Sequence, residues 1–286
     1  VSGSAAMSGP LIAETMDHLV VLAHLRGDTS EVLRLTALGW ATDSTSDLAR
    51  ELLKKLPAVP VALDELVTGG AEGNPFYMEE LVKMLVDQGA IETGEDRWTV
   101  RPDKLLATHV PQTLTGVLQS RLDGLKPAEK LALQQASVIG FVFWDRALAA
   151  VDAIATEALP SVTRRELVVP REDWGPEGVR EYAFKHQILH QVIYDTVLKR
   201  MRRDCHARTA AWLAGLTGAR ANDFLSATAV HFEQAGDDAN ACEFYARAAE
   251  HAAARYAHEG AMGYVARALA LIGNDTHPDN HMLRWR

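Results

Sequence analysis

Hydrophobic residues recur along most of this chain at spacings of three and four, the period of an amphipathic helix. The clearest case is the stretch 75–88, in which four apolar side chains share one face: Tyr77, Leu81, Met84 and Leu85. Asn74 is a good N-cap in front of this stretch, and Pro75 suits the first helical position, where its missing N–H costs nothing. Gly89 offers the left-handed residue with which many helices end. We therefore predict a helix over about 75–88.

The same spacing predicts helices on both sides of this one. Two short helices are expected before it, over about 47–55 and 61–69. Further helices are expected after it, opened by Val110 and Pro111, by Pro127 (running to Gly140), by Asp145 as an N-cap, and by Leu159 and Pro160. A long helix is then expected to reach about Arg203, and an alanine-rich helix pair is expected over 238–272.

Brief apolar runs between turn residues predict a smaller number of strands. Residues 19–24 and 32–35 fit buried strands, and two hairpins are expected further on: 90–91 with 98–100, and 167–169 with 179–184. Helical segments outnumber these strands. The expected fold class is therefore mainly α: a helical bundle, then helices with a small β-wing, then helical hairpins.

Composition changes this picture little, but it excludes several classes of protein. The chain has 286 residues, of which 48% are hydrophobic and 23% charged, as is ordinary for a globular protein of two or three domains. It shows no signal peptide and no apolar run near the roughly 18 residues that span a bilayer. Cys205 and Cys242 lie far apart, so neither a zinc knuckle nor a disulfide framework is indicated. We expect a cytoplasmic location.

Net charge and missing motifs narrow the function further. With a net charge of −9, the chain is not suited to bind nucleic acid through charge. Its sequence contains no Gly-x-x-x-x-Gly-Lys-[Ser/Thr] loop for phosphates, and no apolar strand that ends in paired acidic residues for Mg²⁺. Because it starts at Val1 and stops after Arg286, we interpret it as a fragment. We expect this fragment neither to bind ATP tightly nor to hydrolyse it.

Three stretches carry a resemblance to a known family: the run 73–81, which contains Gly73, Asn74 and Pro75, the run 110–140, and the run 184–194. In order and spacing they resemble the lid and winged helix of the STAND NTPases, which are AAA-like signal-transduction ATPases of many domains. In that family the proline of a Gly-x-Pro segment lies against the adenine of ATP or ADP. The resemblance therefore implies a nucleotide contact at the start of the helix 75–88.

Two further residues take a role from this resemblance. Arg26 follows the apolar run 19–24 and corresponds to an arginine that senses the γ-phosphate. His186 corresponds to a histidine that can contact the β-phosphate of ADP and lock the resting state. An imidazole suits that position because it can donate a hydrogen bond to an anionic oxygen.

The resemblance implies four parts: 1–28, a remnant of the nucleotide-binding core; 29–90, a helical lid; 91–203, a winged-helix domain; and 204–286, tetratricopeptide-like repeats. ATP or ADP with Mg²⁺ would be held in the full-length protein by a P-loop domain upstream in the same chain, and no cofactor is expected for the fragment alone. ADP would hold the winged helix in place, ATP would release it, and the repeats would sense a protein or small-molecule signal. Bacterial regulators of this kind include ones attached to adenylate cyclase or LuxR-type DNA-binding domains.

Each of these residues also has a plainer interpretation. The Gly-Asn-Pro segment is a well-formed helix start in any protein, and an arginine at a strand end usually keeps its charge in water. His186 can be an ordinary histidine of a helix face. With His190 at i, i+4 it can also be a zinc ligand, although Gln187 stands where a metalloprotease has glutamate and no third ligand is evident.

The whole chain has two other interpretations as well. One is a stand-alone helical interaction module that uses no nucleotide. The other is a winged helix that binds DNA through Arg164 and Arg165, although two arginines on a helix more simply form a solvated face. The basic cluster 199–203 is expected at the end of the long helix, where positive charge suits the helix dipole.

Overall fold

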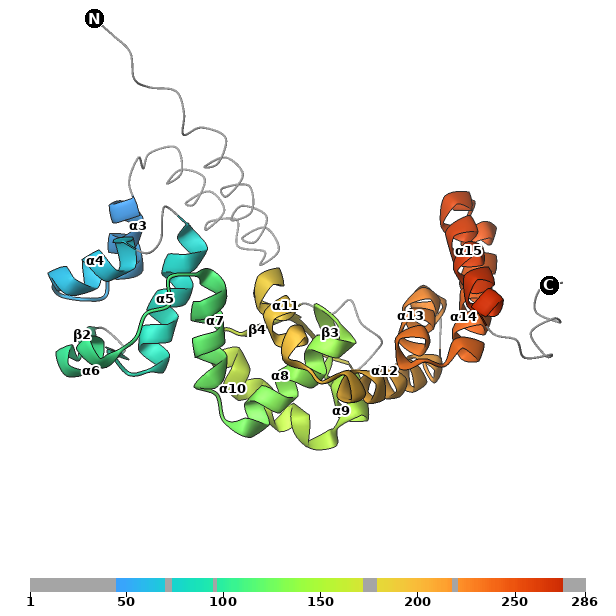
Figure 1. Ribbon diagram of the computed structural model, residues 1–286, viewed down its shortest axis with the longest axis horizontal. Coiled ribbons are helices and arrows are strands. Elements are labelled where there is room, and N and C mark those ends of the chain that lie inside the picture. Colours follow the sequence, from blue (N-terminus) through green and yellow to red (C-terminus); the bar gives the residue numbers. More distant parts are fainter. Residues whose placement is uncertain (1–44, 70–73, 95–96, 172–178, 218–220, 275–286) are drawn as a thin grey trace, which may run out of the picture. The chain divides into compact units, whose positions relative to one another are not determined.

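The computed structural model describes residues 45–69, 74–94, 97–171, 179–217 and 221–274 (Figure 1). These residues are mainly helical, with two small antiparallel sheets. The chain divides into two compact units, Val1–Leu125 and Lys126–Arg286, and each is described by itself. The predicted strands at 19–24 and 32–35 lie outside the described residues.

The described part of the first unit is a helical bundle with one hairpin. Its elements are α3 (Thr45–Leu52), α4 (Val61–Gly69), α5 (Pro75–Asp87), β1 (Ile91–Thr93), β2 (Trp98–Val100), α6 (Pro102–Ala107) and α7 (Leu114–Asp123). The three helices predicted first are thereby confirmed as α3, α4 and α5. Helix α5 buries seven of its 13 residues, because α3, α4, β1 and α7 all pack against it.

A hydrophobic core holds the described part of this bundle together, and α5 supplies much of it. Its fully buried members include Leu63 from α4 and a set from α5: Met78, Leu81, Met84 and Leu85. Each such side chain contributes about 2 kcal/mol relative to leaving it in water. Gly89, at φ +71°, ends α5 and turns the chain into β1, as its predicted role requires.

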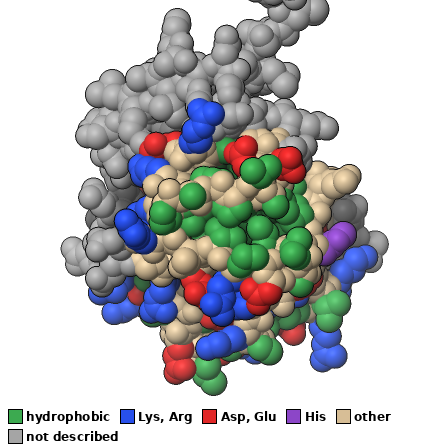
Figure 2. Space-filling model, turned by 90° about the vertical axis from the view of Figure 1, so that its left-hand side faces the viewer, with side chains coloured by type: hydrophobic (Ala, Val, Ile, Leu, Met, Phe, Trp, Pro, Cys, Tyr) green, Lys and Arg blue, Asp and Glu red, His purple; other side chains and the backbone are tan. Residues whose placement is uncertain are grey.

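An apolar stretch of this unit lies at the surface. Residues 57–62, which join α3 to α4 and begin α4, are all apolar and none of them is buried. Val61, for example, is 73% exposed. Figure 2 looks onto the side of the first unit that holds α4, where hydrophobic side chains gather within a rim of charged ones. Such a patch is typical of a surface that meets a partner.

The second unit begins with helices and a three-stranded sheet. Its first elements are α8 (Pro127–Ile139), β3 (Val142–Trp144), α9 (Asp145–Val151), the 3₁₀ helix η1 (Ala153–Ala158), α10 (Leu159–Arg164), β4 (Val168–Arg171), β5 (Glu181–Phe184) and α11 (Gln187–Thr196). The predicted hairpin is confirmed, since β4 pairs antiparallel with β5. Strand β3, which was not predicted, pairs with the other edge of β5 and buries Phe143 against Tyr182 and Phe184.

A row of helices completes this unit: α12 (Lys199–Ala214), the 3₁₀ helix η2 (Ala221–Phe224), α13 (Leu225–Ala235), α14 (Asp238–Ala254) and α15 (His258–Asn274). Each long helix packs on the next, so α13 lies between α12 and α14 (Figure 1). Gly236, at φ +83°, ends α13, and the side chain of Asp237 caps α14 through the Asn240 N–H. Both Cys205 and Cys242 are buried, and the Cys242 thiol donates to the Ala268 carbonyl at 3.5 Å.

The structure corrects the predicted long helix that was to reach Arg203. The chain leaves the helix at Val197 and starts α12 at Lys199, without a glycine or proline at the break. Arg202 stabilises the break, because its Nε donates to the Val197 carbonyl and its Nη2 to that of Asp195. The basic cluster 199–203 therefore opens α12 instead of ending a helix, and the prediction that it lies at a C-terminus was wrong.

Two helix starts differ from their predictions by a few residues. Helix α7 begins at Leu114, not at Pro111, because the Thr113 hydroxyl caps it by accepting the Gly116 N–H at 3.1 Å. Asp145 is the first residue of α9 and not its cap. Its carboxylate accepts the Arg180 N–H, and so ties α9 to the start of β5.

Among the described residues, no helix has both the length and the apolar character needed to cross a bilayer.

Candidate functional site

The predicted adenine contact lies at the first turn of α5. Asn74 is the N-cap, and its Oδ1 accepts the backbone N–H of Phe76 at 3.0 Å and that of Tyr77 at 3.4 Å. Pro75 occupies the next position, where no N–H is required. Pro75 is partly exposed. The predicted local geometry is confirmed, whereas Gly73 lies outside the described residues.

Helix α5 is fixed to α7 by polar contacts along its length. At the first turn, the Tyr77 hydroxyl donates to the Pro111 carbonyl, just ahead of α7, at 2.7 Å. At the other end, the Gln88 amide donates to the Ser120 hydroxyl at 3.1 Å. These bonds fix the position of α5 along α7, in addition to the apolar contacts between the two helices.

A buried ion pair lies between these two contacts. Arg121 of α7 is 2% exposed and Glu80 of α5 is 1% exposed, and Arg121 Nη1 donates to the Glu80 carboxylate. Arg121 Nε donates to Asp87 Oδ2 at 3.0 Å. Burial would lower the pKa of Arg121, but the charges and hydrogen bonds of these two carboxylates outweigh burial and raise it. The guanidinium is therefore held charged inside the bundle.

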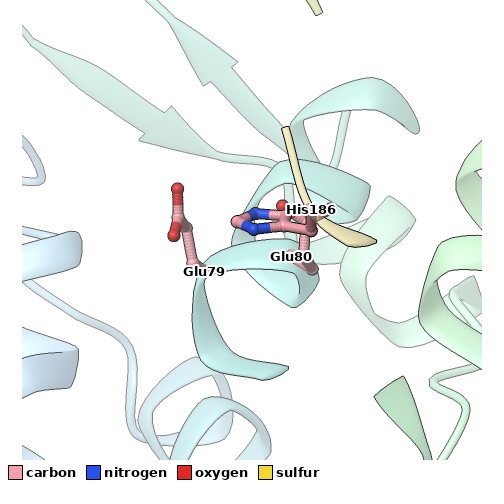
Figure 3. Close-up of side chains that lie close together, drawn as sticks. All are labelled: Glu79, Glu80 and His186. Atoms are coloured by element: carbon pink, nitrogen blue, oxygen red, sulfur yellow. The ribbon is translucent and has the colours of Figure 1, made fainter. Parts of the chain in front are cut away.

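A second acidic residue of α5 lies beside Glu80, and Figure 3 labels both. Lys83 Nζ lies 2.6 Å from Glu79 Oε1 and 3.4 Å from Glu80 Oε1. Glu79 and Lys83 therefore form an i, i+4 ion pair on α5. Figure 3 also labels His186, which belongs to the second unit and is described with that unit.

His186, the predicted phosphate contact, stands between β5 and α11. It is the N-cap residue of α11 by its backbone (φ −137°, ψ 144°), but its side chain makes no capping bond to that helix. The preceding Lys185 is buried, and its Nζ lies 2.6 Å from Glu166 Oε2. Asn74 and Pro75 belong to the first unit, so their geometry and that of His186 are separate observations.

His190, the other half of the predicted zinc pair, is a packing residue of α11. Its Nε2 lies 2.9 Å from the Ser137 carbonyl of α8, and its ring packs edge-on against Phe141 and Phe184. Burial lowers its pKa, an effect that the hydrogen bond to Ser137 opposes. These contacts fit the ordinary helix-face histidine better than a metal ligand.

The other residues singled out from the sequence, Arg26, Arg164 and Arg165, add little to the candidate site. Arg26, the predicted γ-phosphate sensor, lies outside the described residues. Arg164 is exposed at the end of α10, and the charge of Arg165 acts on the partly buried carboxylate of Glu129. A solvated face therefore accounts for Arg164, and Arg165 lies close to an acidic neighbour.

Sequence reasoning missed the partners of Arg121. Glu80 and Arg121 are separated by 41 residues, so no helical spacing connects them. The one available signal was a charged residue on an otherwise apolar face in each helix. Two such residues are expected to pair when their helices pack together.

Comparison with known proteins gave no match to a family model, a curated protein or a solved structure.

Proposed function

We propose that this chain is the regulatory part of a nucleotide-dependent signal-transduction ATPase of the STAND type, acting in the cytoplasm. ATP or ADP with Mg²⁺ would be held by a P-loop domain upstream in the same chain. In this proposal residues 29–90 are the lid, 91–203 the winged helix and 204–286 tetratricopeptide-like repeats. The proposal rests on the sequence resemblance, and the geometry at α5 supports it.

The observation that carries the proposal is the fixed connection from Asn74 and Pro75 to α7. A proline at the first turn of α5 offers an apolar face to an adenine ring. Because Glu80 and Gln88 bond α5 to α7, and Tyr77 bonds it to the segment just ahead of α7, the two helices would shift as one body when Pro75 is displaced. The nucleotide state is thereby passed to the segment that follows α7. Packed elements with specific polar contacts suit such transmission because they do not deform continuously.

Two other features fit this function. The exposed apolar stretch 57–62 gives the first unit a surface for the upstream domain. In the second unit, the chain order α8, β3, α9, α10, β4, β5, with the three strands in one sheet, fits that of a winged helix. His186 stands at the end of β5, where a phosphate contact would report on the position of that sheet.

Calorimetry with ADP tests the proposal on the protein that includes the sequence upstream of Val1. We expect a P-loop upstream, micromolar or tighter binding by the longer protein, and no such binding by residues 1–286. Pro75→Ala should weaken ADP binding, whereas Pro102→Ala, which changes the first-turn proline of α6, should not. His186→Gln should weaken ADP more than ATP. Absence of a P-loop upstream, or equal effects of the two proline variants, would overturn the proposal.

A second candidate function is a helical interaction module without nucleotide. The observation in its favour is a row of exposed apolar side chains along one face of α15: Met262, Val265 and Leu269. These lie at i, i+3 and i+7, so they can receive another helix. A protein that binds its partner equally with and without ADP would favour this candidate.

A further inference from the structure

Two histidines meet inside the second unit, where α12 packs on α13. The Nδ1 atoms of His206 (α12) and His231 (α13) lie 2.8 Å apart, which is hydrogen-bonding distance. Both side chains are buried, with 6% of His206 and 9% of His231 exposed. The backbone of Ile139, the last residue of α8, lies close enough to the ring of His231 to affect its pKa. The pair therefore connects α12 with α13 near the end of α8.

The hydrogen bonds determine where the protons sit. A proton on Nε2 of His206 would be a buried donor without an acceptor among the described residues, whereas a proton on its Nδ1 can be donated across the pair. His206 therefore carries its proton on Nδ1 and donates to Nδ1 of His231, which leaves the proton of His231 on Nε2. Nε2 of His206 is an unprotonated acceptor, and within the described ranges this buried atom has no hydrogen-bond partner. The hydrogen bond between the two Nδ1 atoms therefore has one donor and one acceptor while both rings are neutral.

Protonation would break this arrangement at its centre. A proton on His231 would place N–H groups of both rings against one another across 2.8 Å. A proton on Nε2 of His206 would be a buried donor without an acceptor, next to a second imidazole. In both cases the charged form is stable only if the rings separate and reach water.

The groups around the pair do not favour protonation of either imidazole. Burial, then His231 and Arg202, lower the pKa of His206 to about 4. Burial lowers the pKa of His231 to about 4, although the backbone of Ile139 acts in the opposite direction. Cys205 on α12 is buried, and its thiol pKa is raised to about 11. Asp152, Asp204 and Arg208 act on that thiol, and Glu233 of α13 bonds Tyr245 and Arg267 instead.

We propose that this histidine pair makes the joint between α12 and α13 responsive to protons. The joint is closed while both rings are neutral and opens when they take up protons, which releases α13 from α12. Because α14 and α15 follow α13, acid would loosen the attachment of the whole helical row within this unit. This device uses no nucleotide, so it holds independently of the function proposed above.

Histidine-selective ¹⁵N NMR of the whole chain between pH 7 and pH 4, with amide exchange of α13, tests the proposal. At pH 7 we expect the Nδ1–H tautomer for His206 and the Nε2–H tautomer for His231. If the open joint restores the ordinary value of 6.5, acidification from pH 7 to pH 5 should lower the protection of α13 about 20-fold for each histidine, after correction for intrinsic exchange.

The matched variant is His206→Asn, whose amide can still donate to Nδ1 of His231 but cannot take up a proton. Its loss of α13 protection between pH 7 and pH 5 should be about 20-fold smaller than that of the wild type. The tautomer measurement needs only the wild type, and so holds even if the variant folds poorly. Titration of both rings near pH 6.5 with unchanged protection of α13 would overturn the proposal, as would the opposite tautomers at pH 7.

Discussion

The joint between α5 and α7 and the joint between α12 and α13 are both buried and polar, but they have opposite chemistry. The first contains charges, since Arg121 pairs with Glu80 and Asp87. The second contains two neutral imidazoles, His206 and His231. Burial strengthens the attraction of opposite charges, whereas two buried like groups must stay uncharged. The stability of the two joints should therefore respond differently to the removal of a charged side chain and to protonation.

One of the two large effects is expected from removing the charge of the first joint. Arg121→Met leaves the buried carboxylate of Glu80 without its main partner and should lower the free energy of unfolding by roughly 3 to 5 kcal/mol. The control is Arg101→Met, because Arg101 pairs with Glu92 where both side chains are about half exposed, and its cost should stay below about 1 kcal/mol. Urea unfolding followed by circular dichroism measures both variants.

The double variant Glu80→Gln with Arg121→Met sharpens this result. It removes the buried charge together with its partner, so it should recover part of the stability lost in Arg121→Met. If the double variant were as unstable as the sum of its single variants, the pairing of Arg121 with Glu80 would not be the source of the loss.

The next effect is the response of the second joint to pH. The pKa values of His206 and His231 lie at about 4 in the folded protein, below the 6.5 of a free imidazole. Between these values the unfolded chain binds more protons than the folded one, so stability is full above about pH 6.5 and falls as the pH drops towards 4. Each histidine should account for roughly 3 kcal/mol over this range.

The measurement is urea unfolding of the wild type and of a double variant, His206→Asn with His231→Gln, from pH 7 to pH 4. Both proteins contain the same carboxylates, so acid titration of those groups cancels in the comparison. The wild type should lose several kcal/mol more than the variant. Parallel curves for the two proteins would show that the histidine pair carries no proton linkage.

A smaller effect is expected from the hydroxyl that joins α5 to the segment before α7. Tyr77→Phe removes the hydrogen bond to the Pro111 carbonyl and should cost about 1 kcal/mol. Tyr256, which is 84% exposed, provides the control, since Tyr256→Phe should leave stability unchanged. Equal midpoints for Tyr77→Phe and the wild type would indicate that this bond does not help to hold α5.

The smallest effect belongs to the cap at the start of α5. Asn74→Ala leaves the Phe76 and Tyr77 N–H groups without their acceptor and should cost about 1 kcal/mol or less. Asn74→Asp keeps an acceptor and adds a charge that suits a helix N-terminus, so it should be neutral or slightly stabilising. Thermal unfolding of the two variants side by side distinguishes them, and a less stable Asn74→Asp would contradict the capping role.

Local elements were the part of the fold that the sequence could predict. Asn74, Pro75 and Gly89 mark both ends of α5, and Pro127 and Gly140 do the same for α8. These signals act within one or two turns of chain, so they need no knowledge of the tertiary structure. Strand β3 has only three residues and shows no period, while the break at Val197 depends on Arg202 five residues later.

The polar contacts of the two joints could not be predicted in the same way. His206 and His231 are 25 residues apart, and Arg121 lies 41 residues after Glu80. Which of 11 histidines meets another depends on how the helices pack, and not on local spacing. Within the candidate site, the cap of α5 could therefore be predicted from the sequence. The contacts that connect α5 to α7 could be identified only from the structure.

Amide exchange of both joints in one sample, followed by mass spectrometry at pH 7 and pH 5, tests the contrast most directly. Peptides from α13 should lose protection by about 20-fold or more on acidification, after correction for intrinsic exchange. Peptides from α5 in the same spectra should keep theirs, because Arg121 remains charged throughout this range. An equal loss in α5 and α13, or no loss in either, would contradict the assignment of a charged joint to one unit and a neutral joint to the other.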